Sequence, residues 1–103
     1  MRNNFDKDFY KNIARHSMFL LPSILFRWLP DGKIQGNEYV ARNPKRYDQH
    51  YGSFKINIRT GKWCDFATGD KGGDLISLAA YLFNLSQYEA AKEIAKLAGG
   101  RYA

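Results

Sequence analysis

The stretch SFKINIRTGKWCDF, residues 53–66, constrains the fold of this chain more than any other. In SFKINIR the apolar residues alternate with polar ones, which is the period of a strand with one buried face. The dipeptide TG that follows is a turn signal, and KWCDFA supplies a second strand. We therefore expect a β-hairpin over residues 53–66 whose outward side carries Lys55 and Arg59.

Helices are expected on both sides of this hairpin in the sequence. Residues 5–16 are predicted to be helical because apolar residues recur on one face, and Pro22 should end or kink this helix. After the loop TGDKGGD, Asp74 is predicted to cap one helix at its N-terminus. Ser86 and Glu89 have the spacing of a capping box for a second helix.

The chain is predicted to be one α+β domain, residues 1–103, with an N-terminal helical segment at 1–31 and a module at 32–103. The strand NEYVA should join the hairpin in a small antiparallel sheet of about three strands. This sheet is expected to pack against the N-terminal segment and the two C-terminal helices. The aromatic residues assigned to the core are Trp28, Phe54 and Phe66.

Cysteine usage and hydropathy indicate a cytoplasmic protein. The chain has one cysteine, which excludes an internal disulfide framework and fits a reducing compartment. The polar start MRNNFDKDFYKN lacks a signal-peptide pattern, and the apolar run MFLLPSILFRWLP is too short to span a bilayer. We therefore expect no membrane association.

The positive charge of the chain is concentrated in its middle. The formal net charge is +6, and residues 33–63 hold seven basic and two acidic residues, whereas residues 64–83 hold one basic and three acidic residues. A basic segment of this kind indicates a polyanion-binding face, with nucleic acid as the first candidate. A solvated surface with surplus lysine is the alternative.

Cys64 could be a metal ligand, a nucleophile or a small buried residue. A structural zinc site needs about four cysteine or histidine ligands, usually as close pairs. This chain offers Cys64, His16 and His50, and no two of them are close in sequence. A nucleophile needs a base held beside it, and no local pattern supplies one. We therefore interpret Cys64 as a small buried apolar residue and expect no zinc.

The loop after Cys64 offers two further possibilities. Glycines before a helix can cradle a phosphate, but Asp74 as a cap would occupy the same amides and repel the anion. Asp65, Asp70 and Asp74 could together hold a divalent cation for phosphoryl transfer, although each also has an ordinary turn or cap role. The simpler interpretation is that the glycines allow a tight turn into the helix.

Cations and aromatic rings are interleaved along the basic middle of the chain. Single-stranded nucleic acid is held by this combination, because cations track the phosphates while exposed rings stack on bases. The competing interpretation places the rings at the rim of the core. The candidate phosphate-binding residues are Arg42, Lys45, Arg46, Lys55, Arg59 and Lys62, and the candidate stacking residues are Tyr47, Tyr51 and Trp63.

Three segments resemble the zinc-binding (CHC2-type) N-terminal module of bacterial and phage DNA primases. They are WLPDGKIQGNEYVARNPKR, GSFKINIRTGKWCDFA and KGGDLISLAAYL, and the resemblance spans about two-thirds of the chain. It is closest to the metal-poor versions found in primase–helicase-like proteins of prophages and plasmids. As a set the three segments are fairly specific, though each alone is weak.

The resemblance implies a zinc module that has lost its metal. In the zinc-bearing primases a Cys-Pro-x-His stretch precedes the strand that begins SF, and a Cys-x-x-Cys follows the hairpin. In this chain Asn43 and Arg46 stand at the first pair of positions, and Cys64 and Ala67 stand at the second. Aromatic packing would then replace the metal, through Trp28, Trp63 and Phe66.

For function, the resemblance implies a non-catalytic module that engages single-stranded DNA for a primase, polymerase or helicase. Two alternatives belong to other classes. One is a protein-interaction adaptor whose apolar segment, residues 18–28, docks such a replication enzyme, with Phe19, Leu21 and Phe26 exposed. The other is a small metal-dependent nucleotidyl-transfer enzyme that uses the three aspartates of the loop.

Overall fold

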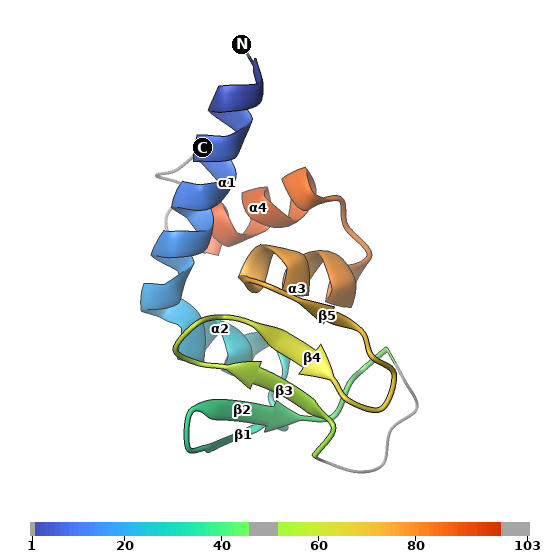
Figure 1. Cartoon of the computed structure of the whole chain (residues 1–103). Coiled ribbons are helices and arrows are strands. Elements are labelled where there is room, and N and C mark those ends of the chain that lie inside the picture. The colour runs from blue at the N-terminus through green and yellow to red at the C-terminus, as the bar shows by residue number, and fades with distance from the viewer. Residues whose placement is uncertain (1, 46–51, 98–103) are drawn as a thin grey trace.

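The chain forms an antiparallel sheet with α-helices packed on one face, so the expected α+β architecture is confirmed (Figure 1). The computed structural model describes residues 2–45 and 52–97. The helices are α1 (Arg2–Ser17), a 3₁₀ turn η1 (Met18–Leu20), α2 (Leu21–Trp28), α3 (Leu75–Phe83) and α4 (Gln87–Leu97). The strands are β1 (Lys33–Gln35), β2 (Glu38–Ala41), β3 (Phe54–Asn57), β4 (Trp63–Asp65) and β5 (Lys71–Gly72).

The sheet has five strands in the order β1-β2-β3-β4-β5, and the prediction of about three was wrong. The two additional strands are the edges of the sheet, β1 and β5, which have three and two residues. Strands this short contain too few residues to show an alternating pattern. The strand β5 lies within the glycine-rich segment that the sequence analysis treats as a loop.

The predicted hairpin is present and its register decides which side chains enter the core. Ile56 lies opposite Trp63, and Phe54 lies opposite Asp65. All four of these side chains are buried on the face that packs against the helices. Because side chains alternate along a strand, the next residue, Phe66, lies on the opposite side and is 68% exposed. The assignment of Phe66 to the core was wrong.

The helices begin and end at recognisable residues. Pro22 lies in the first turn of α2, where a missing N–H removes no helical hydrogen bond, so it starts this helix, whereas α1 already ends at Ser17. Both predicted caps are confirmed. Asp74 accepts a hydrogen bond from the Ser77 amide at 2.8 Å, and Ser86 and Glu89 exchange hydrogen bonds at 2.9 and 3.0 Å.

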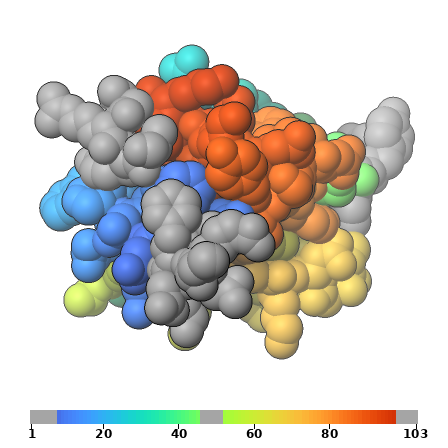
Figure 2. Space-filling view, turned by 90° about the horizontal axis from the view of Figure 1, so that it is seen from above, coloured from blue at the N-terminus to red at the C-terminus, as the bar shows by residue number. Residues whose placement is uncertain are grey.

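The core lies between the sheet and the helices. Trp28 lies at the rim of this core. Its ring is half-buried and packs edge-on against Phe83, with ring centroids 5.6 Å apart. Seen from the helical end, α1 and α4 lie against each other above the sheet (Figure 2). Within residues 2–45 and 52–97, no helix combines the length and the apolar character that a bilayer span requires.

We expect Gly72→Ala to destabilise the fold and Gly73→Ala to leave it nearly unchanged. A Cβ at Gly72 would lie 2.3 Å from Ser77 Oγ and 2.4 Å from Trp63 Nε1, whereas a Cβ at Gly73 meets nothing within 4 Å. Overpacking of this kind reduces stability by about 1–3 kcal/mol. Urea unfolding of the two variants measures the difference, and equal stabilities would contradict this account of the β5–α3 junction.

Candidate nucleic-acid interface

The outer face of the sheet carries lysines from three strands. By the outer face we mean the face opposite Phe54 and Ile56. The strand register places Lys33, Lys55 and Lys71 in one cross-strand row on this face, with Val40 and Cys64 between them. In Figure 1, α2 passes behind the sheet and the outer face is turned toward the viewer.

A shallow hollow of about 400 Å³ lies on this face, over β2, β3 and β4. Lys55 lies between an acidic and an aromatic neighbour in its lining: the ammonium is 3.7 Å from Glu38 Oε1 and 5.8 Å from the centroid of the Phe66 ring. A cation beside an exposed ring is the local arrangement that holds a nucleotide, through its phosphate and its base. The lining residues are Glu38, Lys55, Asn57, Thr60, Lys62, Trp63, Cys64 and Phe66.

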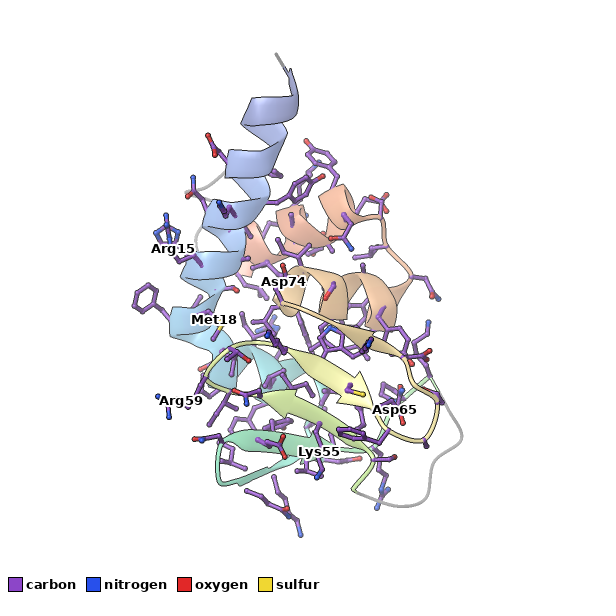
Figure 3. All side chains as sticks on the ribbon, in the orientation of Figure 1. Arg15, Met18, Lys55, Arg59, Asp65 and Asp74 are labelled. Atoms are coloured by element: carbon purple, nitrogen blue, oxygen red, sulfur yellow. The ribbon has the colours of Figure 1, made fainter. Side chains whose placement is uncertain are left out.

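Of the predicted cations, the structure brings Lys55 and Lys62 together in this hollow. Arg59 is exposed in the turn between β3 and β4. In Figure 3 this turn is at the left of the sheet, whereas Lys55 lies on the strands. Arg42 is exposed just after β2. Lys45 points elsewhere: its ammonium donates a 2.6 Å hydrogen bond to Asn84 Oδ1 at the end of α3 and lies over the Tyr81 ring.

The predicted stacking rings are placed differently from the expectation. Tyr47 and Tyr51, like the predicted cation Arg46, lie outside the described residues. Trp63 is only 5% exposed, and its indole N–H donates to Ser77 Oγ at 2.9 Å on the helix side of the sheet. The hairpin register turns its ring inward, so the structure does not favour the predicted stacking role of Trp63.

Phe66 is the aromatic residue that the sequence analysis missed as a binding candidate. A signal for it was available in the hairpin itself. If Phe54 and Ile56 face inward and pair across the turn with Asp65 and Trp63, the residue after Asp65 must face outward. The prediction gave the hydrophobicity of Phe66 more weight than the alternation of side chains along the strand.

Cys64 also lies on the outer face, in the lining of the hollow, and is half-buried there. The interpretation of Cys64 as a small buried residue is correct only in part, because the cysteine alternates with the inward-facing Trp63 and Asp65 and is half-buried on the outer face. Within residues 2–45 and 52–97, no group of three or more His, Cys, Asp and Glu side chains is placed to hold a metal ion.

A polar network joins the end of the sheet to α3. Asn43 Nδ2 donates to Asp65 Oδ2 at 2.8 Å and to Tyr81 Oη at 2.9 Å, and the Tyr81 hydroxyl donates to Asp70 Oδ2 at 2.6 Å. The other carboxylate oxygen of Asp65 accepts from the amide of Ala67 at 2.9 Å. Asn43 and Asp65 are both buried. Buried polar groups satisfied in this way fix one arrangement of the segments that carry them.

This network and the cap of α3 together account for the three aspartates that were considered as cation ligands. Asp65 is buried in it, Asp70 accepts from the Tyr81 hydroxyl at its exposed edge, and Asp74 caps α3. Each carboxylate thus has a partner in the fold, and the three are not directed at a common point.

No family model and no curated protein matches this chain. Its function is therefore inferred from its residues.

Burial raises the pKa of Tyr81 above its ordinary value of 10.0, and the hydrogen bond to Asp70 raises it further. A raised folded-state pKa means that the unfolded chain loses this proton first. The contribution of Tyr81 to stability is therefore complete below pH 10.0 and is lost as the pH rises through the folded-state pKa.

We expect Tyr81→Phe to flatten the loss of stability at alkaline pH, because phenylalanine has no proton to lose. Urea unfolding at a series of pH values from neutral to above the tyrosine pKa measures this slope. The matched control is Tyr88→Phe on α4, where the ring is 54% exposed. A Tyr81→Phe slope equal to that of the wild type would contradict the sign derived above.

Proposed function

We propose that this chain is a non-catalytic module that binds single-stranded DNA on the outer face of its sheet. The observation that carries the proposal is the exposed Phe66 ring beside Lys55, in a hollow that Lys62 also lines. Each stacked base contributes about 1–3 kcal/mol, and the lysines neutralise phosphates on either side. Lys33 and Lys71 extend the positive charge along the same row of the sheet.

The burial pattern supports this use of the face. Burying a phenylalanine contributes about 1.5–3 kcal/mol to stability, and the chain forgoes this at residue 66 while it buries the aspartate at residue 65. A large ring exposed to water adds little to the stability of the fold, but it is available to stack on a base. Base stacking accounts for the exposed ring of Phe66, whereas the burial of Asp65 follows from its hydrogen bonds with Asn43 and the Ala67 amide.

The resemblance to the N-terminal module of DNA primases suggests where such binding would act. In this proposal the module engages the template strand for a primase, polymerase or helicase that performs the chemistry. It does so without zinc: Asn43, at one of the family's ligand positions, is buried and hydrogen-bonded to Asp65 and Tyr81. These hydrogen bonds supply the cohesion that the metal gives in the zinc-bearing relatives.

A second function, docking a replication enzyme through residues 18–28, is favoured by the exposure of Phe19, which is 82%, and of Phe26, which is 48%. The third residue expected at this surface, Leu21, is fully buried in the core. Phe26 also packs edge-on against Tyr39, with ring centroids 5.2 Å apart. Phe19 is therefore the strongest feature for docking.

We expect Phe66→Ala to weaken binding to a dT oligonucleotide by about tenfold, the size of one lost stacking interaction. The matched control is Phe19→Ala, which removes another exposed phenylalanine, from the 3₁₀ turn η1 and outside the lining of the hollow. Fluorescence anisotropy at fixed salt gives both affinities. The docking function predicts the reverse: Phe19→Ala would abolish capture of the replication enzyme, and Phe66→Ala would change nothing.

The salt dependence of binding tests the role of the lysines. On single strands each neutralised phosphate contributes about 0.7 to the slope of log K against log salt, so Lys55→Ala with Lys62→Ala should reduce the slope by about 1.4. Lys92→Ala with Lys96→Ala, on α4, removes the same charge from another surface and should leave the slope unchanged. A wild-type slope near zero would refute phosphate binding by this face.

A further inference from the structure

One residue in the hollow is out of place in a site that only holds phosphates. Glu38 lies in its lining, and its side chain is 40% exposed. A carboxylate repels phosphate, so pure backbone binding would be stronger without it. Its nearest cation, Lys55, is 3.7 Å away, which is longer than a charge-assisted hydrogen bond of about 2.7–2.9 Å. The acceptor capacity of Glu38 is therefore available to a ligand.

Asn57 lies beside this carboxylate. Glu38 and Asn57 are directly opposite each other on β2 and β3, and both line the hollow. Such cross-strand neighbours have Cβ atoms about 4.5–5.5 Å apart. The side-chain oxygen Oδ1 of Asn57 accepts from the backbone amides of Arg59 and Thr60, at 2.8 and 3.0 Å. What Asn57 can offer a ligand is then its amide N–H groups.

We propose that this pair selects guanine as the base stacked on Phe66, an inference that rests on the proposed function. The Watson–Crick edge of guanine presents two adjacent donors, N1–H and the 2-amino group, followed by the O6 acceptor. Glu38 matches the two donors with its two carboxylate oxygens, and Asn57 matches O6 with an N–H. No other standard base has two neighbouring donors on this edge.

The other bases meet a repulsive contact as well as a missing one. Adenine and cytosine place a ring-nitrogen acceptor beside their amino group, and thymine flanks its single N–H with two carbonyl oxygens. In each case a lone pair would face the Glu38 carboxylate. Specificity that combines a matched partner with such a clash is stronger than a match alone. The strand on either side of the selected base is held through phosphates, by Lys55 and Lys62.

The test compares dT 10-mers that carry one central dG, dA, dC or deoxyinosine, by anisotropy at one salt concentration. We expect the dG oligonucleotide to bind about five- to tenfold more tightly than those with dA or dC, the low end of the discrimination of one bidentate contact, because the site is open. Deoxyinosine keeps N1–H and O6 but lacks the 2-amino group, so its affinity should lie between those of dG and dA. Glu38→Gln should bring all four affinities within twofold, and it should tighten binding to unmodified dT because it removes a carboxylate that repels phosphates and the thymine carbonyls.

The control variant is Glu93→Gln on α4, a glutamate that is also paired with a lysine, Lys96, at 3.2 Å. It should keep the preference for dG. If the wild type binds all four oligonucleotides within twofold and retains its salt slope, guanine selection is refuted and strand binding stands. If no oligonucleotide binds at low salt, both proposals fail. A dG preference that survives Glu38→Gln would also refute the assignment to this pair.

Discussion

The register of the β3–β4 hairpin determines both the core and the surface of this protein. Pairing Ile56 with Trp63 and Phe54 with Asp65 sends all four side chains toward the helices. The residues between and after them, Cys64 and Phe66, must then lie on the outer face. A shift of one residue would exchange these sets, exposing the tryptophan and burying a lysine. One pairing thus sets the packing of the core and the chemistry of the hollow.

The end of the sheet is held by hydrogen bonds where the sequence suggested aromatic packing. Of the three rings expected to provide cohesion, only Trp63 is buried, while Trp28 is half-buried and Phe66 is largely exposed. Asn43, Asp65 and Tyr81 connect the segment after β2, the strand β4 and the helix α3 instead. A satisfied buried network of this kind specifies one arrangement, because a mispaired alternative would leave a carboxylate without partners in a dry environment.

Local signals in the sequence were sufficient for the hairpin, the α+β class and the helix caps at Asp74 and Ser86, since each depends on residues close together in the chain. The edge strands β1 and β5 could not be predicted, because their two or three residues are strands only through pairing with distant segments. Of the residues that line the hollow, Lys55 and Lys62 could be selected from charge and alternation. Phe66 was assigned to the core because its hydrophobicity was given more weight than its place in that alternation. The direction of the Lys45 side chain could not be predicted from neighbouring residues, because its partner Asn84 lies at the end of α3.

The same two strands present the core on one face and the hollow on the other. On the inner face Trp63 fits against Gly72 and Ser77 so closely that a single added carbon would collide. On the outer face Lys55 lies 3.7 Å from Glu38 and 5.8 Å from the centroid of the Phe66 ring, in the lining of the hollow. Substitutions on the two faces should act almost independently, since side-chain alternation along the strands separates the two sets. The chemistry of the outer face can therefore change while the core stays the same.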